Sequence, residues 1–283
     1  MALPAFLLKK TPKQRHIRQI RQLIDGQLNT VCESASCPNI GECFSRQTLT
    51  FMILGNVCTR NCAFCGVGKG TTQPVDPDEP KRIAAAVKKL GLNYVVITSV
   101  TRDDLPGGGA SHFSSTIKYL ISNFESLKTE VLIPDFQGNP DSLKIVLDAT
   151  PFVLNHNLET VPRLYQKIRP QANYQQSLNL LANSKKINPN VYTKSGFMVG
   201  LGEETLEVFQ VLKELKNSQC DIVTIGQYLP PSRSHLPAVR YVTPDEFKNY
   251  EEFGKKLGLR VFAGPFVRSS YRAEEKINEI STS

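Results

Sequence analysis

The 283-residue chain has no tryptophan, 3 methionines and 4 histidines, and it has no long run of apolar residues. A membrane-spanning helix needs roughly 20 consecutive apolar residues, so the sequence excludes one. A secretory signal carries its positive charges before a short apolar core, whereas Lys9 and Lys10 follow the apolar residues 2–8. Hydrophobic residues at 40% and charged residues at 21% are typical of a globular protein. We therefore expect a cytoplasmic protein with no membrane partner.

The chain also lacks the signatures of nucleotide and nucleic-acid binding. It contains neither a GxxxxGKS/T nor a GxGxxG motif, and its basic residues are not interleaved with aromatic ones as they are in nucleic-acid readers. Lys and Arg outnumber Asp and Glu by 34 to 26, which gives a formal charge of +8, with a mild basic cluster over Lys9–Arg21. This excess either favours acidic partners or is an ordinary solvated surface. We expect no nucleic-acid partner.

Cysteine, in contrast, is concentrated: of 7 cysteines, six fall between residues 32 and 65. They form two triplets, Cys32, Cys37 and Cys43 in CESASCPNIGEC, and Cys58, Cys62 and Cys65 in CTRNCAFC. In a small secreted domain such a density indicates disulfides, but a large chain without a secretion signal keeps its thiols reduced. Metal ligation or redox chemistry is therefore the better interpretation. The seventh cysteine, Cys220, stands alone and is expected to be a buried apolar thiol.

The spacing of the second triplet predicts an iron–sulfur cluster with an open iron. A structural zinc site is usually built from paired CxxC or Cys/His units and has four ligands, which does not fit Cys58, Cys62 and Cys65. Three thiolates on one tight loop suit three corners of a 4Fe–4S cluster and leave the fourth iron without a protein ligand. The CxxxCxxC spacing resembles that of the radical S-adenosylmethionine (SAM) superfamily. The resemblance implies that SAM binds the open iron and is cleaved there to a 5′-deoxyadenosyl radical.

Strand-like and helix-like segments alternate along most of the chain. The segment 50–54 ends at a Gly55–Asn56 turn, which places the second cysteine triplet after the carboxyl end of a strand. Further strands are expected at 94–100, 130–136, 152–155, 191–198, 222–228 and 259–263, and helices at 79–90, 112–124, 140–148, 174–186, 203–217 and 244–257. This alternation predicts parallel strands with right-handed helical crossovers. We expect an α/β fold, a partial TIM-type (β/α)6 barrel of the radical SAM type over 49–263, between an N-terminal extension (1–48) and a C-terminal extension (264–283).

The first triplet lies in the N-terminal extension, where Ser34, Pro38, Asn39 and Gly41 favour a loop over a helix. Its spacing matches no zinc site, so Cys32, Cys37 and Cys43 are either unrelated thiols or the ligands of a second cluster. Together with the CxxxCxxC loop, this triplet resembles the lipoyl synthases. The resemblance runs through VCESASCPNIGEC (31–43), FMILGNVCTRNCAFC (51–65), TSVTRDDLPGGGA (98–110), NHNLETVPRLY (155–165), TKSGFMVGLGE (193–203), GQYLPPSRSHLP (226–237) and GPFVRSSY (264–271).

The resemblance implies a second, auxiliary 4Fe–4S cluster on Cys32, Cys37 and Cys43, with Ser270 of the RSSY motif as its fourth ligand and Ser269 as the alternative. A hard oxygen is a poor match for iron that otherwise binds soft thiolates, so this corner can open. The activity implied is the insertion of two sulfur atoms, at C6 and C8 of an octanoyl group on a lysine, with two SAM molecules and sulfide from the auxiliary cluster. The partners implied are an octanoylated lipoyl carrier domain (an E2 subunit or the glycine-cleavage H protein), an electron donor such as flavodoxin or ferredoxin, and an iron–sulfur assembly protein.

Candidates for SAM binding follow from the same resemblance. Asn157 and Glu159 in NHNLETV match ribose-binding positions of the related biotin synthases, and an acid that accepts from two hydroxyls is also how dinucleotide sites bind ribose. The alternative is that both cap a following helix. Gly107 and Gly108 are expected to let the backbone approach the methionine end of SAM, and Lys194 is expected to pair with the SAM carboxylate or else to lie on the surface.

Two other classes of function stay open. One is a different radical SAM sulfur-inserting enzyme of the biotin-synthase type, and the other is a non-enzymatic iron–sulfur carrier, which would hold clusters without cleaving SAM. The chain departs from the lipoyl synthases at Phe44, where the family usually has tryptophan, while every cysteine of both triplets is in place.

Overall fold

A computed structural model describes residues 3–9, 13–24 and 27–281. Residues 10–12, part of the basic stretch Lys9–Arg21, lie outside the described residues. None of the helices in these ranges is long and apolar enough to cross a membrane.

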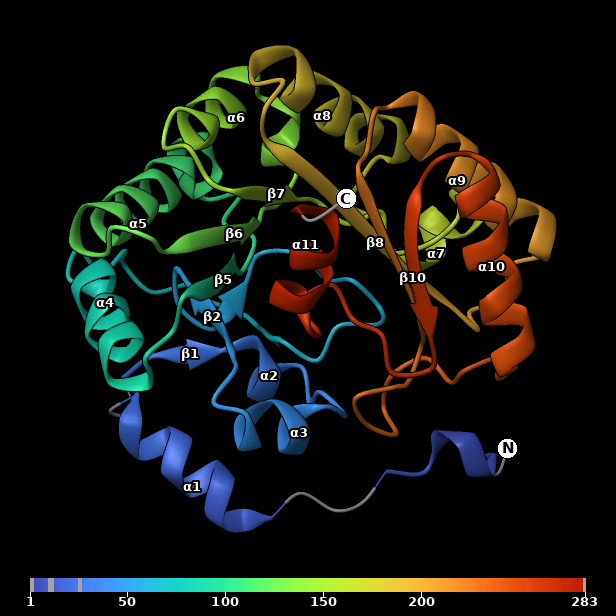
Figure 1. Ribbon diagram of the computed structural model, residues 1–283, viewed down its shortest axis with the longest axis horizontal. Helices are drawn as coiled ribbons and strands as arrows, with labels where there is room; N and C mark the ends of the chain where they lie inside the picture. The colour runs from blue at the N-terminus through green and yellow to red at the C-terminus, as the bar shows by residue number, and fades with distance from the viewer. Residues whose placement is uncertain (1–2, 10–12, 25–26, 282–283) are drawn as a thin grey trace.

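The fold is built on one curved sheet whose order is β1-β2-β5-β6-β7-β8-β9-β10. From β2 (Thr50–Ile53) through β5 (Tyr94–Ser99), β6 (Lys128–Leu132), β7 (Val153–Asn155), β8 (Tyr192–Val199), β9 (Ile222–Gln227) and β10 (Arg260–Gly264), each strand is parallel to its neighbour. Helices α4 (Glu79–Leu90), α5 (Ala110–Asn123), α6 (Pro140–Leu147), α7 (Tyr165–Ile168), α8 (Tyr174–Ile187), α9 (Thr205–Asn217) and α10 (Pro244–Lys256) connect them. Figure 1 shows these helices as an outer ring around the strands. The expected partial barrel of six strand–helix units is confirmed.

Alternation along the strands separates a core outside the sheet from a lumen inside it. On β5, Val95 and Ile97 belong to the large core cluster beneath α4 and α5, whereas Tyr94, Val96 and Thr98 face inward and line a cavity. Successive side chains of a strand point to opposite faces, so a strand buried on both sides reads as a nearly continuous apolar run. This is why the sequence marked these strands clearly.

The sheet does not close on itself, and segments from both ends of the chain fill the gap. Strand β1 (Asn29–Thr30) pairs antiparallel with β2, and helices α2 (Val31–Ser34) and α3 (Ile40–Ser45) follow it. Figure 1 shows α2 and α3 beside the C-terminal helix α11 (Ala273–Ser281), which lies in the middle of the ring. Helix α1 (Gln14–Leu23) packs outside, on α3 and α4. The division of the chain at residues 48 and 263 stays a prediction.

The expectation of a loop around the first cysteine triplet was wrong, because this stretch forms the two short helices α2 and α3. The Thr30 hydroxyl accepts a hydrogen bond from the Glu33 amide at 3.4 Å and caps α2, which stabilises the start of that helix. Asn39 stands at the N-cap of α3 but makes no capping hydrogen bond with its side chain, and Gly41 falls in the first turn of α3, where the missing side chain is tolerated. Cys32 therefore lies in α2, Cys43 lies in α3, and Cys37 lies between the two helices.

Helix α11 covers the amino-terminal end of the barrel. Its Ala273 and Ile277 pack on Tyr94, Val153 and Ile222, which are the first residues of β5, β7 and β9. The opposite end, where the strands finish, carries the second cysteine triplet. The chemistry of parallel barrels gathers at that carboxyl end.

Candidate active site

One cavity of about 760 Å³ runs through the lumen and brings both cysteine triplets together. Its lining includes Cys32, Cys37, Cys43, Cys58, Cys62 and Cys65, together with Asn157, Glu159, Ser269 and Ser270. These residues come from the N-terminal segment, the loop after β2, the loop after β7 and the C-terminal segment. The predicted ligands of both clusters thus line one cavity.

The second triplet lies on the loop that follows β2. Cys58 ends the short strand β3 (Val57–Cys58), which pairs with β4 (Gly68–Lys69) and folds the loop back on itself. The Arg60 amide donates to the Cys58 sulfur at 3.4 Å. Burial raises the pKa of Cys62 and raises that of Cys65 to about 11. Thiols with raised pKa values are protonated in the absence of metal. Binding of iron requires the thiolate, so cluster assembly would release these protons.

Arg60, between Cys58 and Cys62, anchors this loop to the barrel. Its guanidinium is 6% exposed and binds Asp135 after β6 through two hydrogen bonds of 2.7 and 2.8 Å. It also binds Asp103 after β5 through two hydrogen bonds of 2.7 and 3.0 Å. Such bidentate pairs fix geometry as well as contribute energy. This role could not be predicted from the sequence, because the three residues are far apart along the chain.

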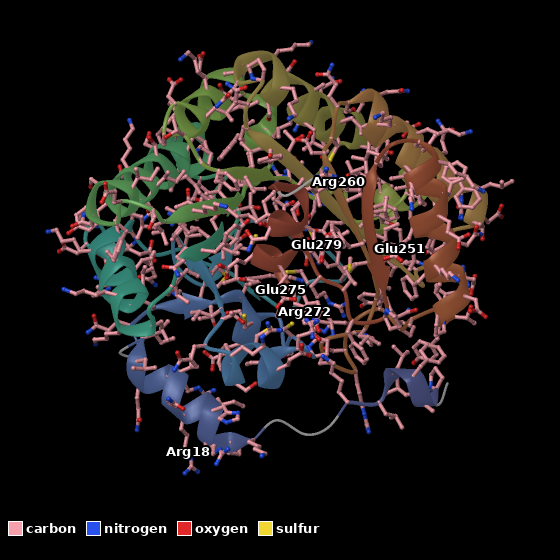
Figure 2. The ribbon with its side chains drawn as sticks, viewed as in Figure 1. Arg18, Glu251, Arg260, Arg272, Glu275 and Glu279 are labelled. Carbon is pink, nitrogen blue, oxygen red and sulfur yellow. The ribbon has the colours of Figure 1, made fainter. Side chains whose placement is uncertain are left out.

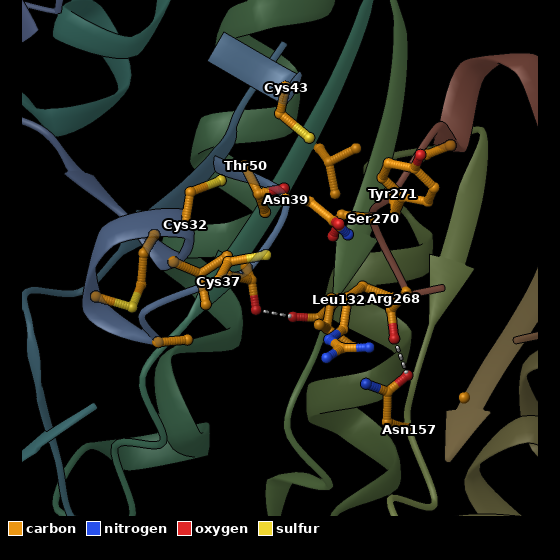
Figure 3. A pocket seen from close by; sticks show the side chains of 18 of the residues that line it. Cys32, Cys37, Asn39, Cys43, Thr50, Leu132, Asn157, Arg268, Ser270 and Tyr271 are labelled. Carbon is orange, nitrogen blue, oxygen red and sulfur yellow. Dashed lines mark hydrogen bonds between the residues drawn. The ribbon is translucent and has the colours of Figure 1, made fainter. Parts of the chain in front are cut away.

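The first triplet faces the C-terminal segment across the cavity. Figure 3 shows Cys37 and Cys43 on one side, with their sulfur atoms directed toward the side on which Ser270 and Arg268 lie. Burial raises the pKa of Cys32 to about 12 and that of Cys43 to about 11. A 4Fe–4S cluster takes each thiolate at a different iron, so its three cysteines need not converge on one point.

The two serines of the RSSY motif differ in their surroundings. The Ser269 hydroxyl donates to Asn157 Oδ1 at 2.9 Å, as the dashed line in Figure 3 shows. The Ser270 hydroxyl lines the cavity and has no hydrogen-bond partner among the described side chains and backbone. A hydroxyl held by a protein acceptor is a poor candidate for a metal ligand, so the arrangement favours Ser270 over Ser269.

Two arginines, one half-buried and one buried, flank the cysteines and carry charge that suits an anionic cluster. Arg268 lies within electrostatic reach of Cys37 and Glu159, and burial lowers its pKa. Arg169, after α7, is 9% exposed and lies beside Cys62 and Glu159. It donates to the carbonyl oxygen of Asn157 at 3.0 Å. Sequence reasoning missed Arg169, which stands in no motif that marks it.

Asn157 and Glu159 are brought together in the cavity wall. Asn157 Nδ2 donates to Glu159 Oε1 at 2.9 Å, and Glu159 Oε2 accepts no hydrogen bond from the described residues. Glu159 adopts a positive φ of 67°, and its amide donates to the Gly196 carbonyl at 3.0 Å. Burial raises the pKa of Glu159, and Arg169 counteracts that rise. A strained backbone that is held by its surroundings is typical of functional positions.

Three of the expected SAM-binding residues do not reach this cavity. Lys194 is 1% exposed and its Nζ lies 2.8 Å from Glu130 Oε1, inside the barrel near the cover formed by α11. The Lys194 ammonium, which was expected to pair with SAM, is therefore already paired with Glu130. Gly107 and Gly108 have φ values of 65° and 62° and approach Ser142 and Phe136, not the cavity. The role of these glycines is the close packing of the loop after β5.

Both ring nitrogens of His156 are held by the protein, and Cys220 is the buried thiol that the sequence predicted. His156 bonds the Ile133 carbonyl and the Ser177 hydroxyl, each at 2.9 Å, and burial lowers its pKa to about 4. Cys220 is 4% exposed, outside the cavity.

The C-terminal segment crosses the lumen beside two glycines. A side chain at either position would obstruct the segment. A Cβ on Gly226 of β9 would lie 2.1 Å from the Val267 carbonyl oxygen, and one on Gly196 of β8 would lie 2.9 Å from the Ser269 hydroxyl. The path of Arg268, Ser269 and Ser270 thus depends on bare backbone in the barrel wall.

We expect Gly226→Ala to push the segment 265–272 away from the wall and to destabilise the protein by about 1–3 kcal/mol, the usual cost of overpacking. Hydrogen exchange of that segment, together with the midpoint of urea unfolding, measures both effects. Gly264→Ala is the matched control, because its Cβ would lie 3.3 Å from the flexible Val267 side chain. Equal exchange in the two variants would mean that the segment does not rest on Gly226.

Comparisons with known proteins agree with this site. A radical SAM superfamily model matches residues 52–215. The lipoyl synthase of Caldanaerobacter subterraneus subsp. tengcongensis is 58% identical over 248 residues, which cover 87% of each chain. The lipoyl synthase of Nitratidesulfovibrio vulgaris is 51% identical over 284 residues, which cover 100% of this chain and 95% of the relative.

Solved structures agree on the fold. Methylornithine synthase (PylB) superposes with a TM-score of 0.59 at 13% identity, covering 90% of this chain and 72% of that one. HydG, a maturase of the FeFe hydrogenase, gives a TM-score of 0.58 at 14% identity, covering 93% and 66%. The barrel architecture, the CxxxCxxC loop at its carboxyl end and the extensive identity with lipoyl synthases lead to one conclusion: the chain belongs to the lipoyl synthase family of radical SAM, sulfur-inserting enzymes.

Proposed function

We propose that this protein inserts two sulfur atoms, at C6 and C8 of an octanoyl group attached to a lysine of a lipoyl carrier domain. One 4Fe–4S cluster is held by Cys58, Cys62 and Cys65, and an auxiliary cluster by Cys32, Cys37, Cys43 and Ser270. When bound, the clusters and SAM supply the radical chemistry and the sulfur. The observation that carries the proposal is that both cysteine triplets and Ser270 face a single cavity.

The residues of the chain supply positioning, charge and exclusion of water. Arg60 holds the SAM-binding loop on the barrel, and Asn157 with Glu159 presents a carboxylate oxygen to the ribose hydroxyls. Arg169 and Arg268 balance the negative charge of thiolate-bound iron. Because a radical inside a cavity must not meet solvent, an enclosed lumen with aligned reacting groups is the main contribution that a protein makes to such a reaction.

Partners and compartment follow from the same chemistry. The substrate is an octanoylated carrier domain, an E2 subunit or the glycine-cleavage H protein, and reduction comes from a donor such as flavodoxin or ferredoxin. Loss of sulfide from the auxiliary cluster requires an iron–sulfur assembly protein to rebuild it. Seven unpaired cysteines suit a reducing compartment, and we propose the cytoplasm.

An anaerobic assay tests the function. Protein reconstituted with iron and sulfide is mixed with SAM, a reductant and an octanoyl-lysine peptide, and the peptide is followed by mass spectrometry. We expect the gain of one and then two sulfur atoms. Cys37→Ala should retain SAM cleavage and lose sulfur insertion, whereas Cys58→Ala should lose both. Cys220→Ala is the matched control, because this thiol lies outside the cavity.

Each other outcome identifies a different error. Cleavage of SAM with an unchanged peptide would retain radical SAM chemistry and reject the octanoyl substrate. Absence of SAM cleavage in protein that holds both clusters would leave only the iron–sulfur carrier. Sulfur insertion by Cys37→Ala at the wild-type rate would reject the auxiliary cluster as the sulfur source.

A further inference from the structure

Glu42 of α3 collects hydrogen bonds from both ends of the chain. Its Oε1 accepts from the Tyr271 hydroxyl at 2.7 Å and from the Arg272 guanidinium at 3.0 Å. Its Oε2 accepts from the ammonium of Lys9 at 3.1 Å. One carboxylate thus joins the N-terminal segment at Lys9 to the C-terminal segment at Tyr271 and Arg272.

The position of this carboxylate links the two halves of the predicted auxiliary site. Glu42 immediately precedes Cys43, and Tyr271 immediately follows Ser270. Because consecutive Cα atoms are about 3.8 Å apart, a hydrogen bond between Glu42 and Tyr271 constrains the separation of the Cys43 and Ser270 backbones. Figure 3 shows Tyr271 and Ser270 on the side of the cavity toward which the Cys43 sulfur points.

Neighbouring contacts reinforce the same junction. Asn39, which is 1% exposed, donates to the Phe266 carbonyl oxygen at 2.7 Å. The ammonium of Lys9 lies 4.6 Å from the centre of the Phe266 ring and 5.5 Å from that of the Tyr271 ring. Arg46, the residue that follows α3, forms an ion pair with Glu275 of α11. In Figure 2, Arg272 and Glu275 lie over the middle of the ring, where the two segments meet.

The loop that carries Ser270 has little other support close to the serine. Its own backbone bonds are two short turns, from the Val267 amide to Gly264 at 3.1 Å and from the Tyr271 amide to Arg268 at 3.1 Å. Ser269 is tied to the barrel through Asn157, whereas the hydroxyl of Ser270 has no hydrogen-bond partner among the described residues. Immediately after Ser270, the side chains of Tyr271 and Arg272 both bond Glu42, and Arg272 also pairs with Glu275 of α11 at 3.6 Å.

We propose that Glu42 is a positioning residue of the auxiliary site, which holds Ser270 at the distance from Cys37 and Cys43 at which its oxygen completes the cluster. This inference rests on the proposed function, since it assumes a serine-ligated cluster. Glu42 acts on Ser270 through its hydrogen bonds with Tyr271 and Arg272.

The test compares Glu42→Gln with Glu33→Gln. Glu33 is the matched control because it is also a carboxylate next to a cysteine of the triplet, but it pairs with Arg21 at 2.7 Å and makes no contact with the C-terminal segment. The first readout is hydrogen exchange of residues 266–272 in protein without clusters. Loss of a charge-assisted hydrogen bond is worth about 1.5–3 kcal/mol, so we expect Glu42→Gln to speed exchange about tenfold or more.

The second readout is the Mössbauer spectrum of protein reconstituted with Mössbauer-active iron, in a background that lacks Cys58, Cys62 and Cys65. An iron with an oxygen ligand gives a subspectrum distinct from those of thiolate-bound irons. We expect this subspectrum in the parent protein with Glu42 intact and in its Glu33→Gln variant. In the Glu42→Gln variant we expect the subspectrum to be lost or broadened. Tyr271→Phe, which removes one hydroxyl, should show a smaller effect that does not add to that of Glu42→Gln, since the two residues form one contact.

The outcomes separate this proposal from the proposed function. If the parent protein lacks the oxygen-ligated iron, the serine-ligated cluster is wrong and the positioning role falls with it. If the parent has that iron and Glu42→Gln retains it, with exchange equal to that of Glu33→Gln, only the positioning role is overturned. Circular dichroism establishes whether each variant is folded. If Glu42→Gln is not folded, Tyr271→Phe tests the same contact.

Discussion

Arg60→Met is expected to destabilise the folded protein by about 3–5 kcal/mol, because it leaves a buried carboxylate without its partner. Asp135 is fully buried and Asp103 is 23% exposed. Burial raises the pKa of Asp135, and the Arg60 guanidinium more than compensates and holds it below its usual value. Without the guanidinium, Asp135 must either take up a proton or draw in water. The loop with Cys58 and Cys62 would then lose its bidentate attachments to the segments that follow β5 and β6.

Urea unfolding under anaerobic conditions measures this loss, and the yield of the cluster on reconstitution measures its effect on the site. Arg60→Lys keeps the charge but cannot bind two carboxylates bidentately, so we expect an intermediate loss. The double variant Arg60→Met with Asp135→Asn removes the stranded charge and should recover part of the stability. A loss below about 1 kcal/mol for Arg60→Met, the level of a surface pair, would contradict the importance of this bridge.

The barrel was predictable because its pattern is local. Strands such as β5 and β9 are buried on both faces, so their apolar runs stand out, and amphipathic helices separate them at regular intervals. The largest boundary error is at β6, expected at 130–136 and observed at Lys128–Leu132. Asp135 accepts a hydrogen bond from the Gln137 amide at 3.0 Å and starts a short 3-10 turn, which is a side-chain effect that apolar patterning does not report.

The proposed cluster ligands could be named from spacing and resemblance, whereas the residues that support them in the fold could not. The six cysteines and the RSSY motif can be recognised in the sequence, because their residue types and spacing indicate metal binding. Arg169 and Glu42 act only because distant segments meet in the folded chain. Lys194 shows the opposite error: a strand start made it a plausible anion binder, but alternation along β8 directs it into the lumen, where Glu130 pairs with it. Local pattern fixes which residues face inward, and only tertiary structure fixes what they meet there.

Substitution of a buried lysine in α11 is the second change with a large expected effect on stability. Unlike Arg60→Met, it is expected to stabilise the folded protein. Lys276 is 7% exposed, and its Nζ has no hydrogen-bond partner among the described residues. It lies 5.4 Å from the centre of the Phe262 ring. Burial lowers its pKa from 10.5 to about 7, with Lys194 acting in the same direction and Glu130 opposing it. At about 1.4 kcal/mol per pKa unit, this depression corresponds to a few kcal/mol of destabilisation when the group is charged.

Lys276→Met is therefore expected to stabilise the protein by a few kcal/mol at and below pH 7, since methionine keeps the length of the side chain without the charge. Above pH 7 the folded protein has released a proton that the unfolded chain keeps up to about pH 10.5. Wild-type stability consequently rises with pH in this window, and the advantage of the variant should shrink toward zero as pH approaches 10.5. Urea unfolding midpoints from pH 6 to 10, with the exposed Lys118→Met as the control, measure the trend. An advantage that does not change with pH would mean that packing, not the buried charge, is the cause.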